Sequence, residues 1–220
     1  MKTDKVLTNK GLLIAVLCIL STIAISFWFY DALPHTIATH WGMNGEANGF
    51  MPKEIGLAIV PAIMVLLVAI LYFVPKLDPL KKNIEEFKNE YQNFIAIFTG
   101  FMLYIQLLTI IINLGIEINM TQFLSPAFAV LFFSMGNLIS KAKRNYFIGI
   151  RTPWTLNSEK VWNKTHAQGG KMFKASGILA LLGIILPNQA IILILAPIIL
   201  TAIYLCIYSY LEYAKEKQKK

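Results

Sequence analysis

The sequence predicts an all-α membrane protein that crosses the bilayer six times and keeps both termini in the cytoplasm. This prediction rests on the composition, on six long apolar runs and on the distribution of basic residues. Of the 220 residues, 56% are hydrophobic and 15% are charged, and the mean hydropathy is +0.59. Because an ordinary soluble domain has about 25% charged residues, this composition disfavours a soluble fold. The high apolar content also excludes intrinsic disorder.

Six apolar runs are the candidate membrane spans. A helix needs roughly 20 residues to cross a hydrocarbon core of about 30 Å, and it satisfies its own amide groups there. The fifth run is short, so the long stems of Lys171 and Lys174 are expected to reach back to the headgroups. Pro187 and Asn188 predict a turn between the fifth run and the sixth. The predicted spans are residues 11–30, 55–74, 94–114, 123–140, 172–186 and 190–211.

The basic residues predict the orientation of these spans. Nineteen of the twenty Lys and Arg flank the first and last runs or lie in the loops 75–93 and 141–174, and Lys53 is the exception. By the positive-inside rule, those regions are cytoplasmic, whereas the loops 31–54 and 115–122 are outside. The cytoplasmic side then carries +11 and the outer side −3, in agreement with the total of +8. The basic charge therefore predicts a multi-pass cell-membrane protein in contact with the lipid bilayer, without direct nucleic-acid binding.

Polar residues recur along the third predicted span. Ser134 and Asn137 of the fourth span are their expected partners, because an amide in hydrocarbon needs a hydrogen bond from another helix. The stripe indicates either bonding between helices or a polar pathway. No acidic, basic or histidine side chain lies at a span centre, which disfavours a coupled transporter. The stripe has an interval of seven and consists of Gln92, Thr99, Gln106 and Asn113.

The first outer loop has the composition of a small ordered cap rather than of a linker. Its glycines suit tight turns, and its aromatic residues suit the membrane interface. The acidic and histidine side chains there match no trusted metal motif, so neither metal nor cofactor is expected. No nucleophile or carboxylate pair accompanies His35 or His40, so the protein is not expected to be an enzyme. The candidate ligand-binding residues are Pro34, His40, Trp41, Gly45, Gly49 and Lys53.

The large cytoplasmic loop contains the second candidate site. Ser158 is the expected N-cap of an interfacial helix that ends at His166, with Trp162 against the membrane. Gly169 and Gly170 are expected to allow a sharp turn into the fifth span, and they form no nucleotide motif. Arg151 could hold a partner carboxylate or tie the loop to backbone carbonyls. The candidate partner-binding residues are Arg151, Thr152, Pro153, Trp154, Trp162 and His166.

Both loops resemble a known family. The run Ile148-Gly149-Ile150-Arg151-Thr152-Pro153-Trp154-Thr155-Leu156, followed by Val161-Trp162, Thr165-His166 and Gly169-Gly170, resembles the signature of the SdpI/YfhL family of bacterial membrane proteins. The segment from Leu33-Pro34 through His40, Gly45 and Gly49 to Lys53 resembles the small domain of unknown function that commonly begins its members. This segment departs from the usual pattern at Ala38, where a second proline is common, and at Asn48, where an acid is common.

The resemblance implies an immunity protein that is also a signal receptor. The best understood member protects a spore-forming bacterium from a secreted killing peptide, and it holds a small autorepressor at the membrane. The implied partners are therefore a secreted toxin peptide and a soluble winged-helix autorepressor. The expected domains are a two-span hairpin (1–74), a connecting region with the third span (75–122) and an SdpI-like region (123–220). The alternatives are an exporter of peptide or lipid and a general envelope-stress protein.

Overall fold

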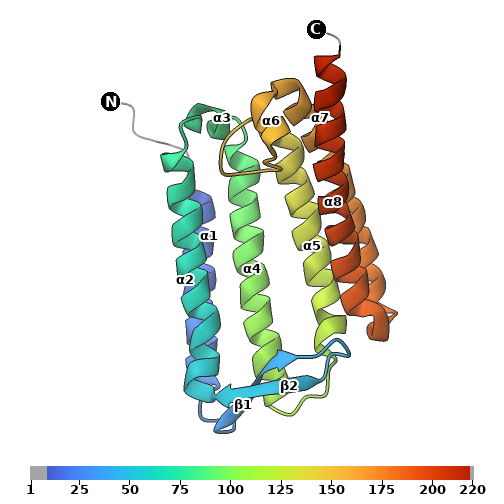
Figure 1. Ribbon diagram of the computed structural model, residues 1–220. Coiled ribbons are helices and arrows are strands. Elements are labelled where there is room, and N and C mark those ends of the chain that lie inside the picture. Colours follow the sequence, from blue (N-terminus) through green and yellow to red (C-terminus); the bar gives the residue numbers. More distant parts are fainter. Residues whose placement is uncertain (1–8, 219–220) are drawn as a thin grey trace.

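Long helices lie side by side and form an elongated bundle (Figure 1). The computed structural model describes residues 9–218. The long helices are α1 (Asn9–Trp28), α2 (Lys53–Leu77), α4 (Lys88–Asn113), α5 (Met120–Lys141), α7 (Glu159–Leu181) and α8 (Ala190–Lys217). The short elements are β1 (Thr36–Trp41), β2 (Ala47–Pro52), α3 (Lys81–Glu85), α6 (Pro153–Asn157), η1 (Leu182–Ile184) and η2 (Pro187–Gln189).

The two ends of the bundle differ. The hairpin end carries β1 and β2, and the loop end carries α3, α6 and residues 142–152, here called the motif loop (Figure 1). The described chain begins and ends at the loop end (Figure 1). This arrangement agrees with an even number of crossings, although which end faces the cytoplasm stays a prediction.

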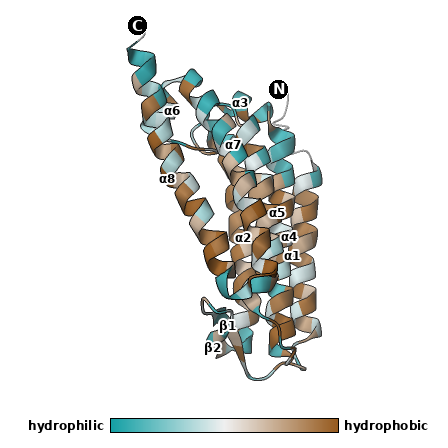
Figure 2. Ribbon diagram, turned by 90° about the vertical axis from the view of Figure 1, so that its right-hand side faces the viewer, coloured by the Kyte–Doolittle hydropathy of each residue, from teal (hydrophilic) through white to brown (hydrophobic). Residues whose placement is uncertain are grey.

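Five helices among residues 9–218 are long and apolar enough to cross a membrane. Many large apolar side chains on these helices are exposed, for example Leu66 on α2 and Leu200 on α8. Apolar residues predominate along the middle of the bundle, and hydrophilic ones gather toward its ends (Figure 2). An apolar surface of this extent fits contact with lipid rather than with water. The five segments are Lys10–Trp28, Lys53–Leu77, Lys88–Asn113, Met120–Lys141 and Pro187–Lys217.

The predicted fifth span has a different structure from the one expected. One continuous helix, α7, runs from Glu159 to Leu181. Three predictions are therefore wrong: an interfacial helix that ends at His166, a turn at Gly169 and Gly170, and a separate helix over 172–186. The first half of α7 is polar and packs against α5 and α8 at the loop end. The six-span count therefore stays a prediction. The turn at Pro187 and the N-cap at Ser158 are confirmed.

Helix α7 packs closely against α5 because both helices carry glycine at their contact. A methyl group on Gly170 would lie 2.9 Å from the carbonyl oxygen of Gly136, and one on Gly136 would lie 2.7 Å from that of Gly170. Gly169 and Gly170 thus allow two backbones to approach, as small residues do between membrane helices. They do not bend the chain.

The outer loop forms a β-hairpin, so the all-α prediction needs a correction at this point. β1 and β2 pair antiparallel, with Ile37 opposite Met51 and Trp41 opposite Ala47. Gly45 has a φ of +80°, which the turn between the strands requires and which only glycine adopts freely. Ile37 is fully buried in an apolar cluster with residues of α2 and α4, and this contact holds the hairpin against the bundle.

Candidate functional site

The motif loop is held in place mainly by two buried polar side chains, Asp78 and Asn145. Asn145 is fully buried; its Oδ1 atom accepts hydrogen bonds from the amides of Phe147 and Ile148, and its Nδ2 atom donates to two loop carbonyls. Asp78, in the turn after α2, accepts from the amide of Tyr146 at 2.8 Å. Because an unpaired buried polar group is costly, these contacts fix the loop conformation. Neither residue stands out in the sequence alone.

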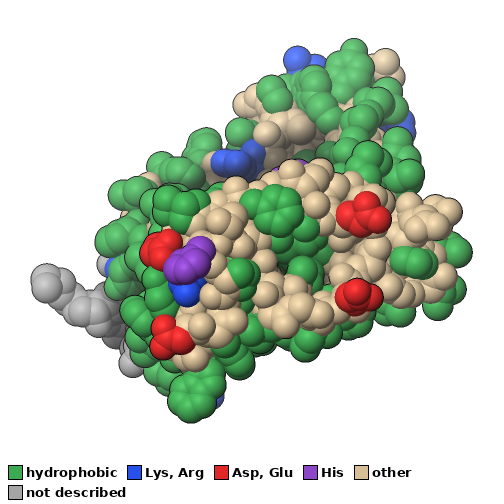
Figure 3. Space-filling view, turned by 90° about the horizontal axis from the view of Figure 1, so that it is seen from below, with side chains coloured by type: hydrophobic (Ala, Val, Ile, Leu, Met, Phe, Trp, Pro, Cys, Tyr) green, Lys and Arg blue, Asp and Glu red, His purple; other side chains and the backbone are tan. Residues whose placement is uncertain are grey.

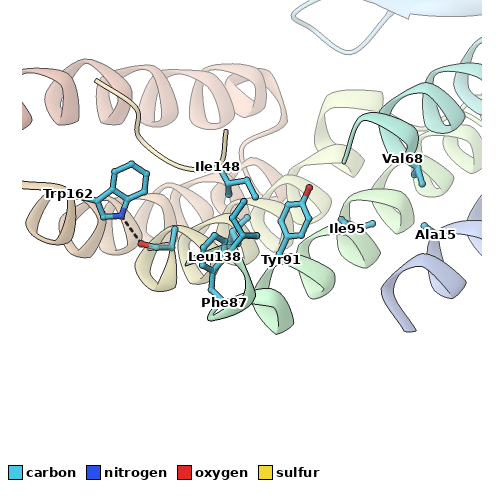
Figure 4. Packing of buried hydrophobic residues seen from close by; sticks show 10 residues of the cluster. Ala15, Val68, Phe87, Tyr91, Ile95, Leu138, Ile148 and Trp162 are labelled. Atoms are coloured by element: carbon cyan, nitrogen blue, oxygen red, sulfur yellow. Dashed lines mark hydrogen bonds between the residues drawn. The ribbon is translucent and has the colours of Figure 1, made fainter. Parts of the chain in front are cut away.

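The side chains of Trp162 and His166 pack beneath the motif loop. Their rings stack with centroids 3.9 Å apart, and both side chains are almost completely buried. The indole N–H of Trp162 donates to the carbonyl of Ala142 at 2.8 Å, at the end of α5 (Figure 4). Trp162 therefore lies inside the protein, and the prediction that it faces the membrane is wrong.

The hydrogen bonds of His166 define its tautomer. Its Nε2 atom accepts from the amide of Ile150 at 3.0 Å, and its Nδ1 atom donates to the carbonyl of Trp162 at 2.8 Å. A backbone amide only donates and a carbonyl only accepts, so the ring is neutral with its proton on Nδ1. Burial lowers the pKa of His166 to about 4, and the hydrogen bond to Trp162 opposes this shift. This geometry gives His166 the role of orienting the loop.

Acid is expected to destabilise the loop end through His166. Between its usual pKa of 6.5 and the folded value of about 4, the unfolded chain binds a proton that the folded chain does not. This contribution to stability is fully present well above pH 6.5 and has fallen by about 2 kcal/mol at pH 5. We expect His166→Gln, which keeps an acceptor but does not titrate, to lack this part of the pH dependence. Equilibrium unfolding in mixed micelles at several pH values measures it, and equal slopes for both proteins would contradict the assignment.

The run Arg151-Thr152-Pro153-Trp154 begins the short helix α6. Thr152 is its N-cap and forms a capping box with the buried Thr155, and Pro153 takes the first helical position, where its missing N–H costs nothing. Thr152 Oγ1 also lies 3.0 Å from Ser209 Oγ of α8, and Trp154 packs edge-on against Tyr210 at 5.2 Å. These contacts place α6 on α8.

Arg151 is exposed and contacts the motif loop itself. Its Nη1 atom donates to the carbonyl of Tyr146 at 2.8 Å, so the guanidinium ties the loop to a backbone carbonyl, one of the two expected roles. The remaining N–H donors of a guanidinium stay available, because the group has five. Tyr146 and Phe147 beside it are 51% and 39% exposed. Together Tyr146, Phe147 and Arg151 form an accessible cationic and aromatic patch at the loop end.

The candidate residues of the hairpin end mainly make contacts within the protein that stabilise the hairpin, and they do not line an open pocket together. Lys53 is buried, its ammonium group donates to the carbonyls of Tyr30 and Leu33, and it lies 4.2 Å from the Tyr30 ring centre. His40 contacts Asn48 across the strands at 2.6 Å. The others occupy the strands and turns, with Gly45 buried, Trp41 and Gly49 half-buried and Pro34 exposed.

Gln106 and Asn113 of the polar stripe of α4 bond to α1, α2 and β1 rather than to the expected partners on α5. Gln106 donates to Ser26 of α1 at 2.8 Å and to the carbonyl of Leu57 of α2 at 3.3 Å. Asn113 bonds to both the amide and the carbonyl of Ala38, at 2.7 and 3.0 Å, and thereby docks β1. Thr99 bonds within its own helix, and Asn137 lies exposed in a separate cleft. Gln106 and Asn113 therefore join helices and hairpin, in agreement with the interpretation as bonding between helices.

A groove of about 450 Å³ lies between α1 and α2 at the hairpin end. Its walls are mostly apolar, and at its edge the hydroxyl of Tyr30 donates to the carboxylate of Glu54 at 2.8 Å. The lining residues are Ile23, Ser26, Phe27, Tyr30, Glu54, Leu57, Ala58 and Pro61. This groove could not be recognised in the sequence, since its two walls come from separate predicted spans.

The hairpin end is acidic. Acidic side chains are visible over this face when the molecule is viewed from below (Figure 3). The chain places Asp31, Glu46, Glu54 and Glu117 in this region, whereas the ammonium group of Lys53 is buried. A cation approaching this end therefore meets a negative potential with little competition from surface lysines.

These features define the chain as a multi-pass membrane protein with a structured cap at one end and a motif loop at the other. Residues 141–209 match the SdpI/YfhL protein family, and residues 16–65 match the domain of unknown function DUF1648. The chain is also similar to "Immunity protein SdpI" of Bacillus subtilis (strain 168), with 26% identity over 208 residues that cover 94% of this chain and 97% of the relative. The three matches confirm the resemblance to the SdpI/YfhL family. No solved structure matches the chain significantly.

Proposed function

We propose that this protein gives its cell immunity to a secreted antimicrobial peptide. The observation that carries the proposal is the match to the Bacillus subtilis immunity protein, which extends over nearly the whole length of both chains. A match of this extent includes the hairpin, the bundle and the motif loop. The five apolar helices agree with an action at the membrane.

In this proposal the hairpin end faces the outside and the motif loop faces the cytoplasm. Nineteen of the twenty basic residues belong to the loop-end segments by sequence, in accordance with the positive-inside rule. A secreted peptide then meets the acidic hairpin end first. The charge there favours a cationic peptide and speeds its arrival.

The groove between α1 and α2 is the proposed peptide site. It offers an apolar wall for an apolar side chain and the carboxylate of Glu54 for a cationic group. Since Tyr30 donates to that carboxylate, the acceptor is already oriented before the peptide arrives. The hairpin beside this groove is stabilised by the other candidate residues of this end, which are Pro34, His40, Trp41, Gly45, Gly49 and Lys53.

Filling the groove is expected to weaken protection. Ala58 is exposed and lines the groove, so Ala58→Trp fills it without removing an internal contact. Ala62→Trp is the matched control, because Ala62 is also exposed on α2 but does not line the groove. Both variants are expressed at equal membrane levels in a sensitive strain that lacks its own immunity gene. We expect Ala58→Trp to lower the toxin concentration for half-maximal killing by about tenfold. Losing one apolar contact worth about 1.4 kcal/mol predicts a change of this size.

The two variants together separate the possible outcomes. Loss of protection with Ala58→Trp alone supports the groove as the toxin site. Full protection with both variants contradicts the groove, and absence of protection by the wild-type protein contradicts immunity. Gradient-driven movement of the peptide across vesicles would support the exporter instead.

Helix α2 gives a physical route from the groove to the motif loop. It begins at Lys53 beside the groove and ends at Leu77, and the following residue, Asp78, binds the amide of Tyr146. A shift of α2 on toxin binding would therefore move the motif loop, provided that the toxin favours one conformer. The exposed patch of Tyr146, Phe147 and Arg151 is the proposed contact for a soluble winged-helix autorepressor. The other candidate residues support this patch: Thr152, Pro153 and Trp154 follow it in the chain, and Trp162 and His166 pack beneath the motif loop.

Arg151→Ala is expected to separate protection from partner recruitment. The variant removes a guanidinium whose free donors could hold a partner carboxylate, and it leaves the groove intact. We expect unchanged survival but weaker toxin-dependent recruitment of a fluorescently tagged repressor to the membrane. Lys160→Ala, an exposed cation on α7 outside the patch, is the control. Unchanged recruitment by both variants would remove Arg151 from this role.

A further inference from the structure

A second cleft, of about 480 Å³, opens between α4, α5 and α7 near the loop end. It lies on the other half of the bundle from the proposed toxin groove and shares no lining residue with it. Its walls come from the first turns of α4, the last turns of α5 and the middle of α7. The cleft therefore lies at the depth where the apolar spans give way to the polar end of the bundle.

The cleft contains two lysines without an acidic partner. Lys141 and Lys174 line it, and no ion pair joins either of them to another side chain in the described part of the chain. Lys174 Nζ lies 5.2 Å from the ring centre of Phe133, which orients the ammonium group beside the cleft. One acid, Glu90, also lines the cleft, so the local balance is positive. Two unpaired ammonium groups facing one cavity favour an anion.

Uncharged polar groups in the same cleft also lack partners. The side chains of Ser134 and Asn137 make no hydrogen bond within residues 9–218, and Ser134 is only 6% exposed. The Ser134 hydroxyl is not among the fully buried unpaired atoms of the described residues, so it is open to the cleft and available to a ligand or to solvent. These donors can bind the oxygens of a phosphate group together with the two lysines.

The deeper wall of the cleft is apolar. Ala96 and Ile97 of α4 line it, within a helix that is apolar enough to span the membrane. The cavity thus has a polar, cationic part and an apolar part, which matches the division of a phospholipid into headgroup and acyl chain. Basic pockets between membrane helices at the headgroup level bind anionic lipids.

We propose that this cleft binds one anionic phospholipid from the leaflet at the loop end. Lys141 and Lys174 contact its phosphate, Ser134 and Asn137 donate hydrogen bonds to it, and an acyl chain lies along Ala96 and Ile97. The lipid would fill the space between α4 and the α5–α7 pair. The inference does not depend on the immunity function.

The test is lipid binding by the full-length protein in detergent, measured by native mass spectrometry. The probes are dioleoyl phosphatidylglycerol, dioleoyl phosphatidylcholine and inorganic phosphate. Lys141→Gln/Lys174→Gln removes both cations from the cleft, and Lys82→Gln/Lys171→Gln removes two exposed cations outside it. We expect the first pair to weaken binding of a single phosphatidylglycerol by about tenfold and the control pair to leave it unchanged.

Each other result overturns the proposal. Equal weakening by both pairs would show attraction to the overall charge, and equal binding of the two lipids would show that no anion site exists. Displacement of the lipid by inorganic phosphate at similar concentrations would assign the cleft to a small anion. Thermal unfolding of both double variants establishes that a loss of binding does not reflect a loss of fold.

Discussion

Replacing Gly149 with alanine is expected to disrupt the loop end. Gly149 has a φ of +121°, where a side chain costs on the order of 1–3 kcal/mol. A methyl group would also overlap His166 Nε2 and approach the Trp162 ring to 3.3 Å. Displacing His166 leaves the Ile150 amide without its acceptor, which adds about 1–3 kcal/mol. We therefore expect a loss of about 3 kcal/mol or more, measured by equilibrium unfolding in mixed micelles.

Gly100→Ala is the control for this substitution. Gly100 lies inside α4, and a methyl group there meets nothing within 4 Å. Because alanine is the better helix former, this variant is expected to be as stable as the wild type or slightly more stable. Equal stability of the two variants would show that the Gly149 backbone and the His166 contact do not constrain the motif loop.

Replacing Gly170 with leucine is expected to separate α7 from α5. Its Cβ atom would lie 2.6 Å from Ser140 Cβ and 2.9 Å from the Gly136 carbonyl oxygen, neither of which is the end of a flexible side chain. Overpacking costs about 1–3 kcal/mol when neighbours can adjust, and here the backbones themselves must move. We expect a loss of about 3 kcal/mol and greater proteolysis in the motif loop, because α5 and α7 both support it.

Ala175→Leu tests whether bulk alone explains such an effect. Ala175 is exposed on the same helix, so leucine there displaces no neighbouring side chain. Near-wild-type stability is expected for this variant. If Gly170→Leu were equally stable, α7 would not pack on α5 through its glycines.

Sequence patterns were sufficient for most of the bundle. The predicted spans 55–74 and 123–140 fall within α2 and α5, because an uninterrupted apolar run of this length leaves few alternatives to a helix. Ser158 was identified as an N-cap because its hydroxyl can accept from an amide three residues on, and it accepts from Val161.

The continuity of α7 could not be inferred in the same way. Trp162 and His166 have helical spacing, and this spacing is the same whether the helix face meets lipid or another helix. The contact with α5 decides that this helix face meets another helix. In that contact the carbonyl of Gly136, far away in the sequence, lies where a side chain on Gly170 would be. No local signal in the polar half of α7 reveals that neighbour.

The residues that fix the motif loop were missed for a related reason. Asp78 and Asn145 are ordinary polar residues in polar loops, and their importance comes from burial that only the fold creates. The hairpin was also missed, because its strands are short and its turn contains several candidate positions for the glycine.

Cysteine labelling tests the central claim, that the hairpin end faces the outside and the motif loop the cytoplasm. In a background with Cys18→Ala and Cys206→Ala, a single cysteine replaces either Met43, which is 66% exposed in the hairpin turn, or Tyr146, which is 51% exposed in the motif loop. A membrane-impermeant maleimide added to intact cells should label the cysteine at 43, and the cysteine at 146 only after permeabilisation. Labelling of both positions in intact cells, or of the cysteine at 146 alone, would contradict the account.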